Sequence, residues 1–269
     1  MLIAALLGLA GLLGGSFANV VAHRGPVLWG FANRPERATG RYDLAWPGSH
    51  CPSCGHGLGP AELVPVLSYL ALRGRCSACG ARIAPRYLLL EALGGLAGLS
   101  AGLLFPVPFA FFVLALLLLL MTAAAVDSET GYLPDALTGP ALWLGLLVSA
   151  TGVGLDPGAA IFGAALGYVA LRGVEEAYRA LRGREGLGRG DAKLLAAGGA
   201  WLGPGSLPFI VLLAAFSALV VIGAQAARGR SVEGGTEVRF GPYLAGAIAA
   251  LLLARPLVPP SVAALLGAP

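Results

Sequence analysis

Residues 109–127 read FAFFVLALLLLLMTAAAVD, and the first charged side chain of this stretch is Asp127, at its end. A helix needs about 20 predominantly apolar residues to cross the hydrocarbon core of a bilayer. The stretch therefore predicts a transmembrane helix over 109–126 that is followed by a carboxylate. Acidic residues in or at the ends of membrane helices are costly and rare, so Asp127 is a candidate functional residue.

The composition places the whole chain in the membrane class. Of its 269 residues, 57% are hydrophobic and only 12% are charged, and the mean hydropathy is +0.79. Soluble domains usually hold about 45–50% apolar and about 25% charged residues. We therefore predict an integral membrane protein.

Seven more apolar stretches lie outward from 109–126 in both directions. Their lengths and the breaks between them predict further spans, at 2–21, 87–104, 136–153, 159–172, 191–203, 206–227 and 240–258. The first resembles a signal peptide, but it lacks a basic leading region and its apolar run continues through Val21, so we expect a retained span. The predicted fold is an all-α polytopic membrane protein with about eight transmembrane helices.

The positive charges are unevenly distributed along the chain. The net charge is +4, and the basic residues cluster in 24–86, 172–193 and 228–239. Threading eight spans places all three clusters on one side of the bilayer, as in the cytoplasmic loops of membrane proteins. We therefore expect the lipid bilayer as the partner and no nucleic acid, with the first basic cluster and Asp127 on the cytoplasmic side.

The polar loop of residues 23–86 holds all the cysteines of the chain. They form two C-x2-C pairs, which are Cys51, Cys54, Cys76 and Cys79. Four thiolates suit a tetrahedral zinc ion, and a cytoplasmic loop keeps its thiols reduced. A loop of this size is too small to fold on an apolar core alone. We predict a structural zinc in a small cytoplasmic loop domain between the first and second spans, and the alternative is four reduced thiols without a ligand.

Other polar residues near this loop have simpler interpretations. The three histidines are expected to be bystanders to the metal site, namely His23, His50 and His56. Glu91 stands near the start of the second span. We favour an interfacial helix charge at this position over a buried carboxylate.

Threading the spans brings three aspartates to the cytoplasmic face, namely Asp127, Asp135 and Asp191. Asp135 and Asp191 each stand where they could simply cap a helix. Two carboxylates held a few ångströms apart cannot both ionise easily, so one keeps a proton. The ionised carboxylate can take a proton from a water that attacks a peptide carbonyl, while the protonated one polarises that carbonyl. Asp127 and Asp191 are the candidates for such a pair.

The residues around Asp191 read GLGRGDAKLL at 186–195. Gly188 and Gly190 allow a backbone to approach closely and to adopt unusual torsions, which suits a substrate strand beside the acid. Lys193 lies two residues after the aspartate and points elsewhere on a helix, so an interfacial cation is favoured over a catalytic one. Four residues are treated as supporting the site: Gly188, Gly190, Asp135 and Lys193.

Three blocks resemble those of type IV prepilin peptidases, which are bacterial membrane aspartic proteases with a G-x-G-D motif. The blocks are GLGRGDAKLLAAGGAWLG at 186–203, AVDSETGYLPDALT at 125–138 and FGPYLAGA at 240–247. The front half is similar too, in GSFANVVAHR, SHCPSCGHGL and VPVLSYLALRGRCSACGARIAPRYLLLE. The resemblance covers nearly the whole chain in order. It maps the catalytic aspartates of the family onto Asp127 and Asp191, and Asp135 onto a frequent residue without a catalytic role.

The resemblance implies an enzyme that cleaves prepilins or pseudopilins after a glycine that ends a short basic leader, at the cytoplasmic face of the bacterial inner membrane. The products assemble into type IV pili, type II secretion pseudopili or DNA-uptake filaments. In many members the same chain N-methylates the new terminal residue with S-adenosylmethionine, and loop 23–86 belongs to the part associated with methyl transfer. We accordingly expect a first helix in 1–22, then this loop, and a peptidase domain of about seven helices in 87–269.

Methylation is less strongly indicated by the residues than cleavage. The chain has no glycine-rich nucleotide fingerprint after a strand, so the residues that bind S-adenosylmethionine are not assigned. Leu63-Val64-Pro65 stands where many members have an Asn before Ile-Pro. Three alternatives stay open: a membrane scaffold or transporter with a zinc loop, a peptidase without methyltransferase activity, and a different G-x-G-D protease, which would not be expected to carry the cysteine loop. The oligomeric state and the particular prepilins are not predicted.

Overall fold

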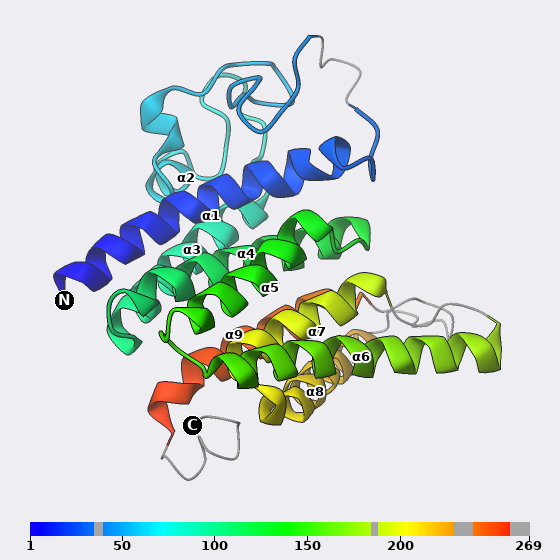
Figure 1. The fold of residues 1–269 in the computed structure, drawn as a ribbon. Coiled ribbons are helices and arrows are strands. Elements are labelled where there is room, and N and C mark those ends of the chain that lie inside the picture. The colour runs from blue at the N-terminus through cyan, green and yellow to red at the C-terminus, as the bar shows by residue number, and fades with distance from the viewer. Residues whose placement is uncertain (35–39, 184–187, 229–238, 259–269) are drawn as a thin grey trace. The chain divides into compact units, whose positions relative to one another are not determined.

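The computed structural model describes residues 1–34, 40–183, 188–228 and 239–258. Within these residues the regular structure is helical, apart from two isolated β-bridges. The longer helices are α1 (Leu2–Leu28), α3 (Pro85–Leu104), α4 (Phe109–Thr130), α5 (Asp135–Ala150), α6 (Pro157–Arg182), α7 (Arg189–Leu202), α8 (Leu207–Ala227) and α9 (Gly241–Ala254) (Figure 1). The short elements η1 (Pro60–Leu63) and α2 (Leu67–Ala71) lie in the cysteine loop.

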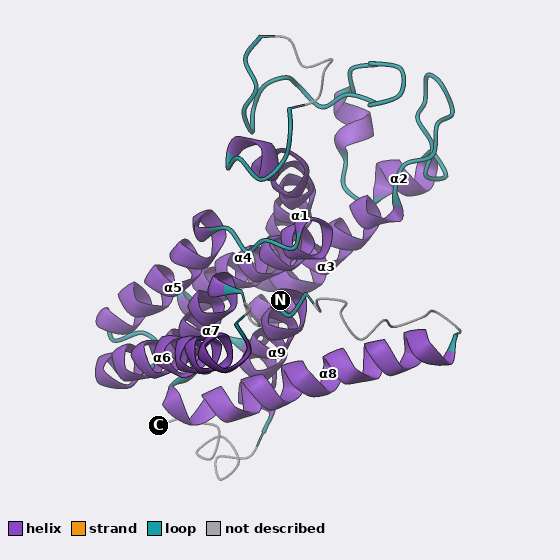
Figure 2. Ribbon diagram, turned by 90° about the vertical axis from the view of Figure 1, so that its right-hand side faces the viewer, coloured by secondary structure: helices purple, strands orange, loops and turns teal. Residues whose placement is uncertain are grey.

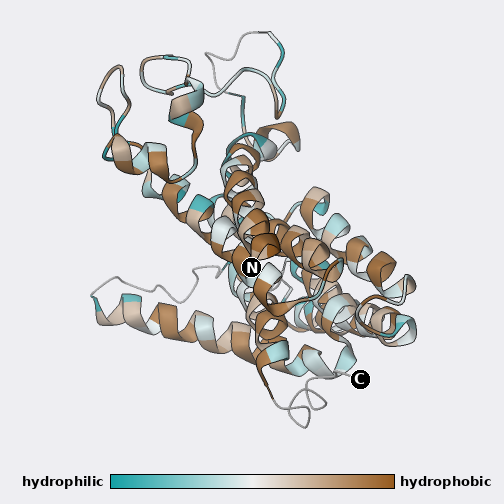
Figure 3. Ribbon diagram, turned by 90° about the vertical axis from the view of Figure 1, so that its left-hand side faces the viewer, coloured by the Kyte–Doolittle hydropathy of each residue, from teal (hydrophilic) through white to brown (hydrophobic). Residues whose placement is uncertain are grey.

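The eight longer helices correspond one to one with the predicted spans. By length and composition, five helices of the described chain could cross a membrane: α1, α3, α4, α6 and α8, the last counted from Pro204. α5 and α9 are shorter apolar helices, and α7 has 14 residues. α1 continues to Leu28, beyond its predicted end at Val21. Apolar residues dominate the helices (Figure 3), and the predicted all-α membrane fold of about eight helices is confirmed.

Helix α6 is longer than the span predicted at 159–172. It continues to Arg182, so the first part of the predicted polar loop is helical. Arg172 forms an ion pair with Glu175 at 2.5 Å, and Gly183 ends the helix with a left-handed φ of 68°. Ion pairs three and four residues apart stabilise a polar helical extension. Hydropathy ended the span too early because it does not weigh such pairs.

The first compact unit of the chain, Met1–Leu118, is built on an antiparallel pair of helices, α1 and α3. The two helices meet through glycines. A Cβ added at Gly11 would lie 2.0 Å from the carbonyl oxygen of Gly94, and one added at Gly98 would lie 1.9 Å from that of Leu7. Only glycine lets two helix backbones come this close, as in the small-residue interfaces of membrane helices.

The second compact unit, Leu119–Pro269, is built around helix α7. This helix contacts α5, α6, α8 and α9, and all its residues in Leu194–Leu202 are buried. A Cβ added at Gly199 would lie 2.1 Å from the carbonyl oxygen of Gly163 in α6. Packing on all sides therefore fixes the position of α7, and with it the position of the residues in its first turn.

Candidate active site

Two buried carboxylates meet in the second unit. Asp127 lies in the last turn of α4, and Asp191 lies in the first turn of α7. Their exposed fractions are 4% and 6%. Asp191 interacts electrostatically with Asp127, so the ends of two helices bring the carboxylates together. These are the two aspartates that the sequence predicts as a pair.

Asp191 is held by the start of its own helix. It is the third residue of α7, and its Oδ2 accepts a hydrogen bond from the backbone N–H of Gly188 at 3.2 Å. This is half of a capping box, because the N-cap residue Gly188 has no side chain to return the bond. Asp191 therefore stands inside the first turn and not at the N-cap position considered from the sequence.

Leu133, in the hairpin after α4, packs against the start of α7 and the start of α9. A Cβ added at Gly190 would lie 2.4 Å from Leu133 Cβ. One added at Gly241 would lie 2.7 Å from Leu133 Cδ1 and 2.7 Å from Asp127 Oδ2. The close approach predicted at Gly190 is thus made by the protein's own hairpin, and Gly188, with a φ of −71°, adopts no unusual torsion.

Arg239 is a charged neighbour of Asp127. From the sequence it is predicted only as one of the basic residues that mark the cytoplasmic loops. Its guanidinium donates a hydrogen bond to the carbonyl oxygen of Ser128 and interacts electrostatically with Asp127. The backbone amide of Gly241 also interacts with Asp127. The signal that could have found Arg239 is its place directly before the FGPY block.

Asp135 and Lys193 form an ion pair that is more exposed than the two buried carboxylates. Lys193 Nζ lies 2.5 Å from Asp135 Oδ1, and the two side chains are 36% and 74% exposed. The pair joins the start of α5 to α7, two residues after Asp191. Asp135 is the first residue of α5, and the N-cap residue is Pro134, so Asp135 is not the cap considered from the sequence.

The buried pair has the properties of an acid–base centre. Within the described residues, Asp127 Oδ2 and Asp191 Oδ1 are buried and have no hydrogen-bond partner. A buried charge without compensation is costly, and neighbouring carboxylates avoid a double charge by keeping one proton. One ionised and one protonated carboxylate can bind a water molecule between them and polarise a carbonyl group.

The four cysteines of the first unit form a cluster. Their sulfurs all lie within 4.8 Å of one another, and none is in a disulfide. Cys51 Sγ lies 3.9 Å from Cys79 Sγ, and Cys54 Sγ lies 4.0 Å from Cys76 Sγ. A tetrahedral zinc with Zn–S bonds of about 2.3 Å places its sulfurs about 3.8 Å apart. The donor set and its spacing therefore fit the predicted zinc ion.

Two turns of the same form present these thiols. The Gly55 N–H donates to the Cys51 carbonyl oxygen at 2.9 Å, and the Gly80 N–H donates to that of Cys76 at 2.9 Å. Gly55 and Gly80 have φ values of 77° and 70°, which only glycine adopts without strain. An isolated β-bridge closes each turn, between His50 and Gly57 and between Arg75 and Arg82.

The histidines beside the cluster have other partners. His50 Nδ1 lies 2.9 Å from the Gly48 carbonyl oxygen. His56 Nε2 lies 3.3 Å from Glu62 Oε2. The Ser77 hydroxyl and the backbone amide at the start of η1 hold the pKa of the Glu62 carboxyl below its usual range, so an ionised Glu62 faces His56. These contacts agree with the interpretation of His50 and His56 as residues outside the metal site.

Glu91 is buried, and its interpretation as an interfacial charge is wrong. The residue is 8% exposed and lies on the face of α3 that packs against α1. Its Oε2 accepts a hydrogen bond from the backbone N–H of Val66 at 2.7 Å. The partner comes from the cysteine loop, which is distant in sequence, so a hydropathy profile cannot show it.

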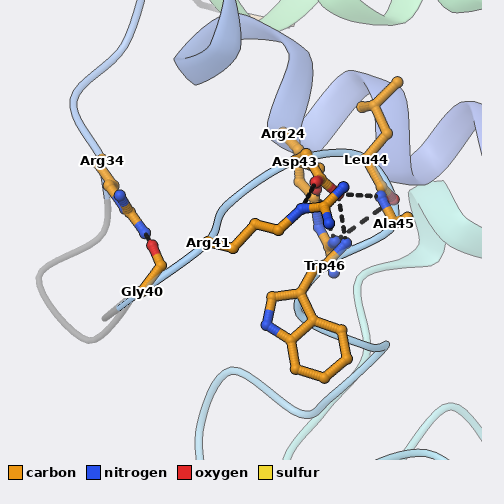
Figure 4. A network of polar contacts seen from close by, with 8 residues as sticks. All are labelled: Arg24, Arg34, Gly40, Arg41, Asp43, Leu44, Ala45 and Trp46. Carbon is orange, nitrogen blue, oxygen red and sulfur yellow. Dashed lines mark hydrogen bonds and ion pairs between the residues drawn. The ribbon is translucent and has the colours of Figure 1, made fainter.

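Backbone carbonyl oxygens of residues 43–48 accept hydrogen bonds from the guanidinium of Arg24, and Figure 4 shows part of the polar network around it. Arg24 is 7% exposed and donates to the carbonyl oxygens of Asp43 at 3.0 Å and Gly48 at 3.5 Å. The Asp43 carboxylate in turn accepts a hydrogen bond from the Trp46 N–H at 2.6 Å. Arg24 is thus a buried support of the loop as well as one of its positive charges.

Comparison with known proteins assigns a family to each half of the chain. The bacterial peptidase A24 N-terminal domain matches residues 9–105, which contain the cysteine cluster, and the type IV leader peptidase family matches residues 112–223, which contain both buried aspartates. A prepilin leader peptidase/N-methyltransferase of Burkholderia pseudomallei is 45% identical over 255 residues, which cover 90% of this chain and 82% of the relative.

Two further relatives bear the same name. The protein of Pseudomonas aeruginosa is 42% identical over 254 residues, which cover 88% of this chain and 85% of the relative. The protein of Dichelobacter nodosus is 37% identical over 253 residues, which cover 88% of this chain and 87% of the relative. No solved structure matches the chain significantly.

Proposed function

The chain belongs to the type IV leader peptidase family, and we propose that it cleaves the leader from type IV prepilins or pseudopilins and methylates the new amino terminus. The observation that carries the proposal is the buried pair of Asp127 and Asp191 within the stretch that matches the family. The similar proteins are named for both activities.

In the proposed cleavage, the two aspartates activate one water molecule. The Arg239 cation beside Asp127 favours a negative charge there, so Asp127 takes the proton from the water. Asp191 keeps the other proton and donates a hydrogen bond to the carbonyl oxygen of the scissile bond. Attack of the water gives a tetrahedral intermediate, and the proton held by Asp127 then passes to the leaving amine. No covalent bond between enzyme and substrate is formed.

The substrate is proposed to reach this pair at the cytoplasmic face of the bacterial inner membrane. Asp127 stands in the last turn of α4, a helix that is long and apolar enough to cross a bilayer. A prepilin has a short basic leader followed by an apolar helix, so its cleavage site lies at the same boundary. The clustering of basic residues in the loops on one side supports this orientation.

The cysteine loop is proposed to support the second activity. Its four thiolates would hold a structural zinc, and four sulfurs would leave no open position on the metal for chemistry. The proposed methyl donor is S-adenosylmethionine, which supplies an activated methyl group when it is bound. No residue of the described chain is assigned to its binding.

The proposal is tested by co-expression with a candidate prepilin, with the gel mobility and the mass of the mature pilin as readouts. Asp127→Asn and Asp191→Asn should each lower cleavage by about 10²–10⁴-fold, because asparagine cannot exchange the proton. Asp135→Asn changes an exposed aspartate near the same site and should process normally. Full processing by the double variant of Asp127 and Asp191 would overturn the proposal. A cleaved pilin without the added methyl group would support the proposed cleavage and overturn the proposed methyltransferase activity.

A further inference from the structure

Residues 63–70, LVPVLSYL, are an apolar segment inside the polar cysteine loop. They include the end of η1 and the first part of α2. Four large apolar side chains of the segment are exposed, Leu63 by 43%, Val64 by 41%, Leu67 by 65% and Leu70 by 58%. A concentration of exposed apolar side chains in so few residues marks an interaction site.

Hydrogen bonds tie this segment to the beginning of α3. The Val66 N–H donates to Glu91 Oε2 at 2.7 Å, and the Tyr69 hydroxyl donates to the Ile83 carbonyl oxygen at 3.3 Å. Figure 2 shows α2 beside the start of α3. Val66 has a φ of 62°, which is strained for a β-branched residue. The contact with Glu91 therefore holds a strained turn in one defined place.

The position of Glu91 along α3 sets the depth of the segment. The apolar part of this helix runs from Tyr87 to Leu104. At 1.5 Å per residue that part is about 27 Å long, against a hydrocarbon thickness of about 30 Å, so none of it can be left outside the bilayer. Glu91 lies one helical turn inside this apolar part. Its partner Val66 must then lie close to the hydrocarbon boundary.

Positive charges follow the segment closely in the sequence. Three exposed arginines follow it in the loop, namely Arg73, Arg75 and Arg82. Arg86 stands in the first turn of α3, with its guanidinium carbon 5.2 Å from the centre of the Tyr87 ring. Apolar side chains at the hydrocarbon boundary with arginines beside them are the pattern of an interfacial anchor in a bilayer that contains anionic lipids.

We propose that residues 63–70 are a membrane-surface anchor of the cysteine loop. Their apolar side chains enter the acyl boundary of the adjacent leaflet, and Arg73, Arg75 and Arg82 bind the anionic headgroups above it. The anchor holds the cysteine cluster at the membrane surface. It depends on α3 crossing the bilayer and not on the chemistry of the aspartates, so the two proposals can fail separately.

The depth of the segment can be measured in the purified full-length protein in lipid nanodiscs. A nitroxide attached through p-acetylphenylalanine at Leu67 or Leu70 leaves the four cysteines untouched. Electron paramagnetic resonance power saturation then compares access of oxygen, which concentrates in lipid, with access of a nickel chelate, which stays in water. A label at Leu96, 61% exposed on α3, gives the lipid reference, and one at Ser77, exposed in the cysteine loop, gives the water reference.

The expected result is high oxygen access and low nickel access at both positions, as at Leu96. Nickel access as high as that at Ser77 would overturn the proposal. Low access of both reagents would show that protein covers the segment, either a second copy or a substrate, and would overturn it as well.

Variants at Glu91 and at the arginines sharpen this test. Glu91→Gln keeps an acceptor oxygen for the Val66 N–H and should leave the label at Leu67 in lipid, whereas Glu91→Ala should raise its nickel access. Unchanged nickel access of the label at Leu67 in Glu91→Ala would show that this hydrogen bond does not hold the anchor in place. The zinc content of each variant reports whether the loop is still folded.

The headgroup contacts have their own measurement. The labels in the unsubstituted chain should lie deeper in nanodiscs with anionic lipid than in purely zwitterionic ones. Changing three arginines to glutamine, at Arg73, Arg75 and Arg82, should abolish that difference. A depth that does not respond to lipid charge would exclude the arginine–headgroup contacts.

Discussion

The cysteine cluster and the aspartate pair are both polar sites in a membrane protein, but the chain builds them in different ways. The cysteines come from two turns of the same form, each closed by its own backbone hydrogen bonds. The aspartates come from the ends of α4 and α7, and only the packing of helices brings them together. Local turns can be recognised from residue spacing, whereas a packed site depends on residues far from it in sequence.

This difference predicts different sensitivities. One added methyl group at a helix contact should disturb the aspartate pair. The cysteine cluster should tolerate such changes and respond to the loss of a ligand. The rate of prepilin cleavage and the zinc content, measured on the same variants, separate the two kinds of site.

Gly190→Ala should lower cleavage by up to about 10²-fold, the scale for a reacting group that is displaced by about 1 Å. Its Cβ would lie 2.4 Å from Leu133 Cβ, so either the hairpin or the first turn of α7 must move. A movement of the first turn of α7 displaces Asp191. The measurement is the cleavage rate of a purified prepilin, with the zinc content expected to stay unchanged.

The matched control for this change is Gly173→Ala. Gly173 lies in α6 and has open space where a Cβ would stand, so cleavage should stay normal. A second change, Leu133→Gly, should restore part of the rate to Gly190→Ala, because it removes the Cβ that the new methyl group would meet. Normal cleavage by Gly190→Ala alone would show that this contact does not position Asp191.

Arg239→Gln should lower cleavage by about tenfold near neutral pH, because the cation beside Asp127 favours the ionised carboxylate that takes the proton from water. Asp127 must be ionised to take a proton from water, and without the cation a higher pH is needed for ionisation. The acidic limb of the pH–rate profile should therefore move to higher pH, and the defect should shrink as the pH rises. Arg239→Lys keeps the charge and should retain the profile. An unshifted pH–rate profile in Arg239→Gln would show that Arg239 does not act on the ionisation of Asp127.

Cys76→Ser should abolish zinc binding, because serine is a poor ligand for zinc. The loss should destabilise the cysteine loop, since structural zinc contributes about 10–16 kcal/mol to the folding of zinc-finger peptides. The aspartates lie in the other compact unit, so we expect cleavage to fall less than in Arg239→Gln and methylation to fall more. Metal analysis and the mass of the mature pilin are the two readouts. Ser53→Ala, in the turn of Cys51, keeps all four thiols and should keep the ion. Zinc retained after all four cysteines are changed to serine would refute the ligand assignment.

The sequence predicts the helices well because a membrane-spanning helix needs about 20 consecutive, mostly apolar residues, and a pattern of that length is easily recognised. All eight predicted spans correspond to helices, even where a single residue is misjudged. The end of α6 is the counterexample. Ion pairs on its surface extend the helix past the apolar residues to Arg182, and hydropathy does not include them.

Buried polar residues are less predictable, because their partners come from elsewhere in the chain. The sequence predicts Glu91 at the membrane interface, whereas a backbone N–H of the cysteine loop makes its burial possible. Charge patterning treats Arg24 only as a loop charge, whereas its guanidinium donates hydrogen bonds to three carbonyl oxygens of the loop. Arg239, just before the start of α9, donates a hydrogen bond to the last turn of α4. Each of these contacts requires the fold before it can be seen.

Lys193→Ala should change cleavage least, by less than about fivefold, which corresponds to the 0–1 kcal/mol that an exposed ion pair contributes. Lys193 follows the G-x-G-D motif at a distance of two residues, yet it pairs with Asp135, and their side chains are 36% and 74% exposed. A double-mutant cycle with Asp135→Asn measures their coupling, which should weaken as salt is added. A loss as large as that of Asp191→Asn would place Lys193 in the catalytic centre. Burial and helix packing would then fail to separate catalytic from supporting residues in this motif, and nearness in sequence to Asp191 would be the better guide.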